Sequence, residues 1–183
     1  MESLPSRSAN RFPNAGTSYT DDSSYLDGSY GESLRQAVER LYTAFADCHL
    51  SVPLRGCPHC FTDADLDYLR TTPLRSLTHG DLYVVATKLI TTLGEPSDAG
   101  YFAPRILEAL AEGAYIELES VADRLSQIPV TSWNPERRQA LYEYFSVLFE
   151  AIEGTWAYLG DENRRTYVRK ALPSIFSVSG EQA

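Results

Sequence analysis

The sequence predicts an all-α fold, built as a compact bundle of about seven helices. Apolar residues recur at helical spacing from Ser33 onward, and no alternating strand pattern is found beyond the short link from Ser51 to Leu54. Capping signals, glycines and prolines divide the chain at intervals that suit helices. A length of 183 residues with 43% hydrophobic residues fits one domain that can bury a core without disulfide bonds.

The two ends of the chain differ in composition from its middle. We expect a disordered tail over residues 1–31, a single α-helical domain over residues 32–176 and a flexible C-terminus over residues 177–183. The tail is rich in Ser, Asn, Gly, Asp and Pro, so it cannot bury enough apolar surface to offset the entropy of ordering. Its Ser-Tyr pairs are either a recognition segment or chance tyrosines in a tethered coil, and they lie at residues 18–19, 24–25 and 29–30.

The first three helices are predicted from their capping signals and their stops. Each opens on a capping box, which begins at Ser33, Thr62 or Thr78. In the first helix Cys48 continues the apolar stripe, and in the third Gly94 provides the C-terminal stop. The predicted spans are residues 33–48, 62–72 and 78–94.

Four further helices follow in the second half of the chain. Pro104 is expected in the first turns of the fourth helix, or to divide it, and Gly113 follows its end. Asn134 and Pro135 provide an N-cap and a first-turn proline for the sixth and longest helix, and Pro173 ends the last one. The predicted spans are residues 97–112, 116–128, 134–159 and 161–172.

Residues 73–113 have the rhythm of a helical hairpin, in which a capped helix, a short turn and a second amphipathic helix follow one another. This pattern is similar to one unit of a HEAT-like repeat. The run Cys-Pro-His-Cys at residues 57–60, with Pro-Leu-Arg-Ser-Leu-Thr at 73–78 and Ala-Pro-Arg-Ile-Leu-Glu at 103–108, also resembles uncharacterised bacterial all-helical proteins. The resemblance implies a helical fold, and it implies no known activity.

The charge of the chain bears on its partners. A net charge of −9 and a pI near 4.8 argue against nucleic-acid binding, which needs a basic face. No apolar run approaches the roughly 18 residues of a membrane helix, and the N-terminus has neither the basic nor the apolar region of a secretory signal. Three cysteines are an odd number, so a closed disulfide framework is not expected. We therefore expect a cytoplasmic protein that binds neither nucleic acid nor membrane.

All cysteines and histidines fall between Cys48 and His79. Cys57-x-x-Cys60 has the spacing of half a structural zinc site, because two thiolates at that spacing can bind one tetrahedral ion from a tight turn. Cys48 and His79 could complete a Cys₃His site that holds the loop between two helix ends. The alternative is structural, since Cys48 lies on an apolar stripe and His79 fits the first turn of a helix. Apart from this zinc ion, no cofactor is predicted.

Two other interpretations of the cysteine pair stay open. Cys57 and Cys60 could form a reversible disulfide, although a thioredoxin-like motif is typical of a βαβ context that this sequence lacks. They could equally be partly buried thiols in a simple turn, which Gly56 and Pro58 favour.

Catalysis has little support in the sequence. The nucleophile, metalloprotease and phosphate-loop motifs Gly-x-Ser-x-Gly, His-Glu-x-x-His and Gly-x-x-x-x-Gly-Lys do not occur. A Cys–His pair, either Cys60 with His79 or Cys48 with His49, could act as nucleophile and base, but no family signature accompanies it. We therefore do not expect an enzyme.

Acidic residues gather on the predicted sixth helix. Glu136, Glu143 and Glu150 recur every seven residues and so share one side of the helix, and Glu153 widens this ridge. Trp133 precedes the helix, where a tryptophan is either a buried plug or an exposed anchor for a partner. The alternative for the ridge is an ordinary solvated helix face. These five residues form the predicted partner-binding surface.

We expect the chain to be a non-enzymatic, acidic protein-binding module. Its most concrete form is an immunity or antagonist protein, which neutralises a basic partner such as a toxin by presenting carboxylates to a basic surface. The first alternative is a zinc- or thiol-dependent regulatory protein that uses the segment from Cys48 to His79. The second alternative is a small enzyme with a Cys–His pair.

Overall fold

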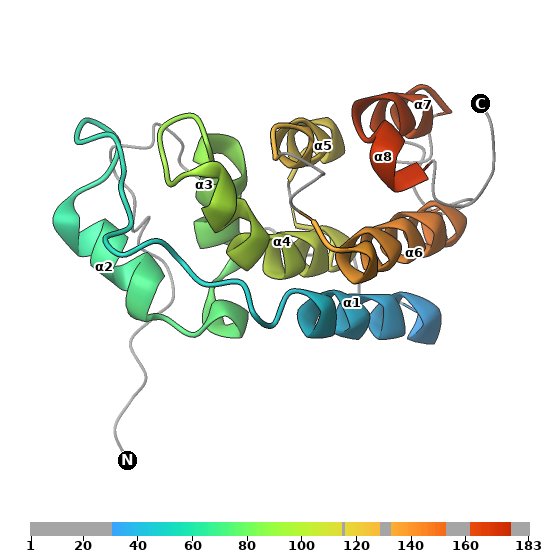
Figure 1. The fold of residues 1–183 in the computed structure, drawn as a ribbon, viewed down its shortest axis with the longest axis horizontal. Helices are drawn as coiled ribbons and strands as arrows, with labels where there is room; N and C mark the ends of the chain where they lie inside the picture. Colours follow the sequence, from blue (N-terminus) through green and yellow to red (C-terminus); the bar gives the residue numbers. More distant parts are fainter. Residues whose placement is uncertain (1–30, 115, 129–132, 153–161, 177–183) are drawn as a thin grey trace, which may run out of the picture.

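The computed structural model describes residues 31–114, 116–128, 133–152 and 162–176 (Figure 1). The all-α prediction is confirmed over these residues, whose only extended pairings are isolated bridges. Residues 1–30 and 177–183, where we expect the tail and the flexible C-terminus, lie outside them. The helices are α1 Glu32–Ala44, α2 Asp63–Thr71, the short 3₁₀ helix η2 Leu74–Ser76, α3 His79–Lys88, α4 Pro96–Ala111, α5 Leu118–Ser126, α6 Pro135–Ile152, α7 Glu162–Ala171 and α8 Pro173–Phe176.

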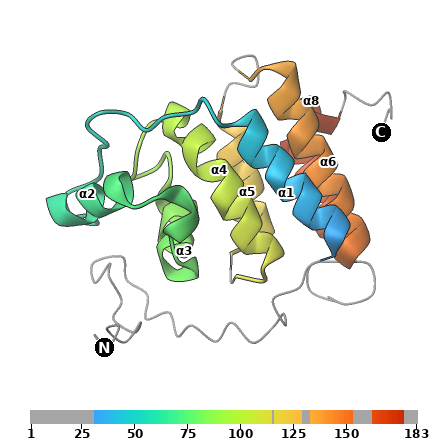
Figure 2. The same ribbon diagram turned by 90° about the horizontal axis from the view of Figure 1, so that it is seen from below.

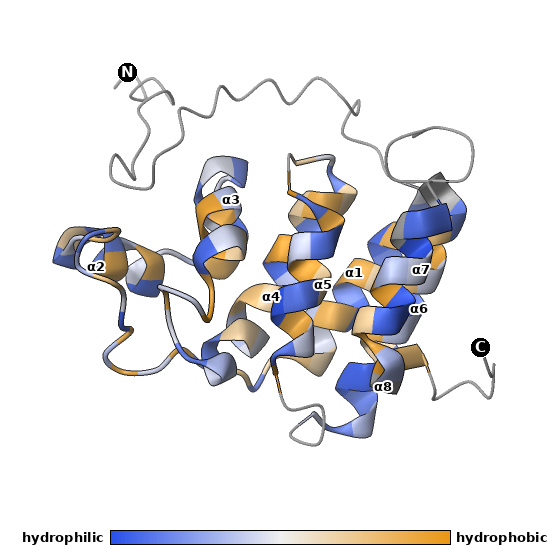
Figure 3. Cartoon of the chain, turned by 90° about the horizontal axis from the view of Figure 1, so that it is seen from above, coloured by the Kyte–Doolittle hydropathy of each residue, from blue (hydrophilic) through white to orange (hydrophobic). Residues whose placement is uncertain are grey.

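Helix α4 lies at the centre of the bundle and contacts α1, α3 and α5 (Figure 1). Along one side α6 packs against α1, and α2 and α3 lie at the end of the molecule away from α7 and α8 (Figures 1 and 2). Every residue of α4 from Phe102 to Ala111 is buried. By contrast, α7 is largely hydrophilic and covers the bundle through the buried Val168 (Figure 3). The core therefore forms around α4.

Capping side chains define three helix starts as predicted. At the start of α2, the Asp65 N–H donates to Thr62 Oγ1 (3.2 Å) and the Thr62 N–H donates to Asp65 Oδ2 (2.8 Å). Thr78 and Asp81 form the same capping box at the start of α3. Before α6, Asn134 Oδ1 accepts a hydrogen bond from a first-turn N–H (2.8 Å). These bonds satisfy backbone donors that the first helical turn leaves without partners.

Helix α1 differs from the prediction at both ends. It begins at Glu32, and the Ser33 capping box does not form, because the Gln36 side chain donates instead to the Glu32 carboxylate (3.0 Å). It ends at Ala44, before Cys48 is reached. Cys48 still packs against the core from outside the helix, so the apolar stripe alone does not mark where the helix ends.

Helix α3 ends at Lys88 rather than at the predicted stop, Gly94. The Lys88 carbonyl accepts hydrogen bonds from the N–H groups of residues 91–93 (2.9–3.1 Å), which closes a tight loop. Within it Ile90 has a positive φ of 68°, a backbone conformation that is costly for a β-branched residue. The chain therefore leaves helical geometry immediately after Lys88.

The early end of α3 follows from pairing with the segment that precedes α2. The Cys57 N–H donates to the Thr92 carbonyl (2.8 Å), and the Gly94 N–H donates to the Arg55 carbonyl (2.7 Å). Backbone groups used in this bridge cannot also make helical hydrogen bonds. Periodicity alone misses the loop, because its buried leucines also fit a helical stripe.

Pro104 lies in the middle of α4, and the helix is not divided. The expectation that Pro104 would fall in the first turns or break the helix is wrong, because burial on all sides offsets the one helical bond that proline cannot make. Helices α3 and α4 contact each other, as a hairpin requires, and Gly113 follows α4 with a positive φ of 81°. At the other end of the domain, Pro173 starts the short α8.

Asp98 attaches the link between α1 and α2 to the central helix. Its side chain is 0% exposed and accepts hydrogen bonds from the N–H groups of Ser51 (2.6 Å) and Glu95 (2.7 Å). Gly94 allows this arrangement, because a Cβ added there would lie 2.9 Å from Asp98 Oδ2. One buried carboxylate thus holds both the link and the first turn of α4.

Replacing this carboxylate should destabilise the whole domain. We expect Asp98→Ala to lower the free energy of unfolding by about 2–4 kcal/mol, because two charge-assisted hydrogen bonds are lost together. Urea denaturation followed by circular dichroism measures the change. The control is Asp67→Ala, whose exposed ion pair with Arg70 should contribute less than about 1 kcal/mol. Equal effects of the two substitutions would contradict the role of Asp98.

Candidate functional site

The structure does not bring the four predicted zinc ligands together. Among the residues that it describes, no three His, Cys, Asp or Glu side chains are grouped in a way that could hold a metal ion. Cys48 packs on α4, so closely that its Sγ would lie 3.0 Å from a Cβ added at Gly100. The His79 Nε2 lies 2.8 Å from a carboxylate oxygen of Glu112, the C-cap residue of α4. The Cys₃His arrangement is not assembled, because α4 holds two of its members in other contacts.

Cys57 and Cys60 lie in a turn just before α2, and both are free, half-buried thiols. The Cys57 carbonyl accepts hydrogen bonds from the N–H groups of Cys60 (2.9 Å) and Phe61 (3.0 Å). The Nδ1 atom of the exposed His59 lies 3.8 Å from Cys57 Sγ. This contact is a Cys–His pair that the sequence analysis did not consider, and it arises because the turn brings residues i and i+2 together.

Hydrogen bonds lower the pKa of the Cys57 thiol. The largest contribution comes from the His59 backbone N–H, the His59 ring adds a second, and Cys60 adds smaller ones. Each of these bonds favours the thiolate, which is the nucleophilic form of cysteine. Burial has the opposite effect on Cys48 and raises the pKa of its thiol. The pKa of the Cys57 thiol in the turn is therefore shifted down, whereas that of the Cys48 thiol against α4 is shifted up.

A buried charge network, which the sequence analysis missed, surrounds Arg105 of α4. Arg105 is 8% exposed, and its Nε and Nη2 donate to the Leu77 carbonyl (3.3 and 3.2 Å). Its Nη1 donates to carboxylate oxygens of Glu108 (3.0 Å) and Glu112 (2.8 Å). Because Glu112 also contacts His79, the network joins α4 to the start of α3.

Tyr42 and Arg75 extend this network to α1 and η2. The Tyr42 hydroxyl donates to Glu108 Oε2 (2.6 Å), and the Arg75 guanidinium lies over the Tyr42 ring, 3.7 Å from its centroid. Arg75 also donates to the Glu39 carboxylate of α1 (2.7 Å). Burial raises the pKa of the Tyr42 hydroxyl, and the bond to Glu108 raises it further. Tyr42 is therefore a neutral hydrogen-bond donor here.

The network is structural in character, because each of its charged groups meets an opposite charge or a backbone acceptor. Its sequence signal is the pair Arg105 and Glu108, which stand three residues apart on a helix that is otherwise apolar around them. The two sequence runs at 73–78 and 103–108 also supply four of its members, Arg75, Leu77, Arg105 and Glu108. Polar residues inside an apolar stripe are therefore the signal that could have identified this cluster.

The predicted acidic ridge is only partly available for binding. Glu136 and Glu150 are exposed, and neither is bonded to another described residue. Glu143 lies between them and forms an ion pair with Arg40 of α1, so it helps to join α6 to α1. These contacts lower the pKa of Glu143, since hydrogen bonds from Gln139 and Arg40 outweigh the opposing effect of burial. Glu153 lies outside the described residues.

Trp133 is a plug rather than an exposed anchor. It is 6% exposed, and its ring meets that of Phe45 edge to face, with centroids 5.9 Å apart. The contact fixes the start of α6 against the C-terminal end of α1. Trp133 is therefore not part of an exposed partner-binding surface, because its ring is packed in the core.

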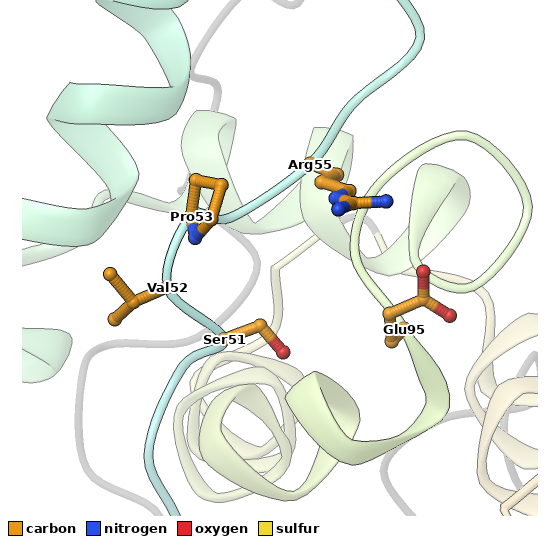
Figure 4. Close-up of a pocket in the computed structure, with 5 residues that line it drawn as sticks. All are labelled: Ser51, Val52, Pro53, Arg55 and Glu95. Carbon is orange, nitrogen blue, oxygen red and sulfur yellow. The ribbon is translucent and has the colours of Figure 1, made fainter.

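An open hollow of about 220 Å³ lies beside the link between α1 and α2 (Figure 4). It is lined by Ser51, Val52, Pro53, Arg55 and Glu95, and Val52 is 85% exposed. The Arg55 and Glu95 side chains lie on the same side of the link in this view. The hollow is smaller than the roughly 300–1,000 Å³ of typical ligand pockets. Its lining includes neither thiol nor imidazole, so it is separate from the turn at residues 57–60.

Comparison with known proteins finds no relative: no family model, no curated protein and no solved structure matches the chain. The HEAT-like pattern and the resemblance to bacterial helical proteins therefore stay predictions. Within the described part of the chain, none of the helices has the length and apolar character that crossing a membrane would require.

The pKa of Glu112 gives the buried network a pH signature. Burial alone would raise this pKa, but hydrogen bonds from His79 and Arg105 outweigh burial and hold it below the ordinary 4.5. A carboxylate with a lowered folded pKa contributes stability that is fully present above pH 4.5 and is lost as the pH falls through the folded value.

Glu112→Gln should therefore lower the free energy of unfolding at neutral pH by about 1.5–3 kcal/mol, the range for hydrogen bonds to charged groups. The difference between wild type and variant should shrink as the pH falls below 4.5 and through the lowered pKa of Glu112, because wild-type Glu112 then becomes neutral as well. Urea titrations at several pH values measure both quantities. Glu136→Gln, on the exposed face of α6, is the control and should change stability by less than about 0.5 kcal/mol. A difference that does not depend on pH would contradict this account.

Proposed function

We propose that the chain is a non-enzymatic protein-binding module whose exposed α6 face binds a basic partner protein. The most concrete form of this function is an immunity or antagonist protein that blocks a basic enzyme such as a toxin. The observation that carries the proposal is the pair of exposed carboxylates, Glu136 and Glu150, on one side of α6. The net charge of −9 supports the same assignment, because it favours encounter with a positively charged surface.

The spacing of the two carboxylates suits an extended protein surface. They are two heptads apart on a continuous helix, which places them on the same side and about 21 Å from each other along the axis. This span is comparable to one side of a standard protein–protein interface. A basic partner that meets both carboxylates must therefore present two well-separated positive groups, as an extended protein surface does.

The ion pair between Glu143 and Arg40 determines how the proposal is best tested. Reversing the charge of Glu143 would disturb the contact between α6 and α1, and a loss of binding would then be ambiguous. Glu136 and Glu150 can be changed without breaking a bond to any described residue. Substitutions at these two positions therefore test partner binding without removing a contact that stabilises the fold.

The double variant Glu136→Lys/Glu150→Lys should lose the partner at low salt. We expect its dissociation constant to rise at least about tenfold, because two attractive charge contacts become repulsive, and we expect the difference to shrink at high salt. The partner is first captured from the native cells with the tagged wild-type chain and identified by mass spectrometry. Titration calorimetry with the purified partner then measures the affinity of each variant.

A matched control is Asp63→Lys/Asp67→Lys on α2, at the far end of the molecule (Figure 1). It makes the same change in net charge on another exposed surface, and the exposed Asp67–Arg70 ion pair that it breaks contributes less than about 1 kcal/mol. The affinity of this control should therefore stay near that of the wild type. Equal weakening by both double variants would show that only net charge matters and would contradict a specific α6 face. Capture of no basic protein at low salt would contradict the proposal as a whole.

A further inference from the structure

The backbone of the Cys57–Cys60 turn places the Cα atoms of the two cysteines close enough for a disulfide between them. A hydrogen bond from the N–H of Cys60 to the carbonyl of Cys57 (2.9 Å) closes a four-residue turn. In such a turn the first and last Cα atoms are less than about 7 Å apart. Disulfides in proteins join cysteines whose Cα atoms are about 4.4–6.8 Å apart. The described backbone is thus compatible with a disulfide between Cys57 and Cys60 without a large rearrangement.

The turn is also held in place from both sides. The Cys57 N–H is bonded to the Thr92 carbonyl (2.8 Å), which fixes the turn to the loop after α3. Gly56 packs so closely that an added Cβ would lie 2.9 Å from Leu66 and 3.1 Å from Phe61. The thiols are therefore presented on a fixed support, and little conformational entropy is lost when they react.

The third observation concerns access and the chemical neighbours of each thiol. All three thiols are partly exposed, but Cys48 is packed against α4, where its Sγ would lie 3.0 Å from a Cβ added at Gly100. The His59 Nδ1 lies 3.8 Å from the Cys57 Sγ and provides a polar partner for this sulfur. Among the three thiols, Cys57 is thus the one that combines access with a hydrogen-bonding neighbour, and Cys60 is the nearest thiol in sequence.

We propose that Cys57 and Cys60 form a dithiol–disulfide exchange site, with Cys57 as the attacking sulfur, Cys60 as the resolving sulfur and low-molecular-weight disulfides as the substrate class. This site is independent of the partner-binding face on α6. It makes no use of Glu136 or Glu150, and the failure of either proposal leaves the other intact.

The reaction consists of two exchange steps. The Cys57 thiolate attacks one sulfur of the disulfide RSSR, the S–S bond breaks, and one thiolate RS⁻ leaves with the electron pair. Cys60 then loses its proton to solvent and attacks the Cys57 sulfur of the mixed disulfide, and the second RS⁻ leaves. Two electrons pass from the cysteine pair to RSSR, and the two protons released by the cysteines are balanced by the protonation of two RS⁻ to RSH.

The test uses the full-length reduced chain with oxidised glutathione as the probe, followed by intact-mass measurement and peptide mapping. The wild type should form a Cys57–Cys60 disulfide and keep Cys48 as a thiol. Cys60→Ser should accumulate one glutathione on Cys57, because the resolving thiol is missing. Cys57→Ser should react at least about tenfold more slowly than the wild type, because the more reactive thiolate is lost.

Cys48→Ser is the matched control and should react at the wild-type rate. Circular dichroism of every variant separates a chemical effect from a loss of folding. A disulfide that maps to Cys48, equal rates for Cys57→Ser and wild type, or no intramolecular disulfide at any glutathione ratio would each overturn the proposal. Stoichiometric zinc bound by Cys57 and Cys60 in the isolated chain would also overturn it, since both thiols would then be metal ligands.

Discussion

The buried guanidinium of Arg105 is the constraint around which the helices are arranged. A cation at this depth is expensive unless charges and hydrogen-bond acceptors surround it. Glu108 on the same helix and Glu112 at its C-cap supply the charge, and the Leu77 carbonyl supplies an acceptor from another segment. The carbonyl can do so only when the chain between η2 and α3 lies against α4. One side chain therefore determines how two neighbouring elements approach the central helix.

This network changes the meaning of the acidic composition. Three of the carboxylates, those of Asp98, Glu108 and Glu112, make internal contacts with backbone N–H groups or cationic side chains. Another carboxylate, that of Glu143, joins helices at the surface through Arg40. The carboxylates that can meet a partner are consequently fewer than the net charge suggests. A binding surface is better identified from exposed carboxylates that have no internal bond than from the charge of a sequence segment.

Local sequence signals predicted the helices well, whereas long-range contacts determine where some helices end and which side chains of the site meet. Capping boxes such as the one at Thr78 depend on neighbours within one turn, so they could be read directly from the sequence. The loop at residues 89–94 could not, because it is fixed by backbone bonds to residues 55–57. The same holds for the site. Cysteine spacing singled out the turn at residues 57–60, but only the fold shows that His79 contacts Glu112 and that Trp133 is buried.

The packing of α6 on α1 also has a consequence for how the chain folds as it is synthesised. Arg40 and Glu143, which meet across this contact, are separated by 103 residues. At about 5–20 residues per second, the first helix leaves the ribosome about 5–20 s before its partner. During that interval its apolar face, which includes the buried Leu34, Val38 and Leu41, lacks the cover that α6 later provides. The nascent chain therefore carries this apolar face without its α6 cover, and the final docking of α6 closes a long loop late in folding.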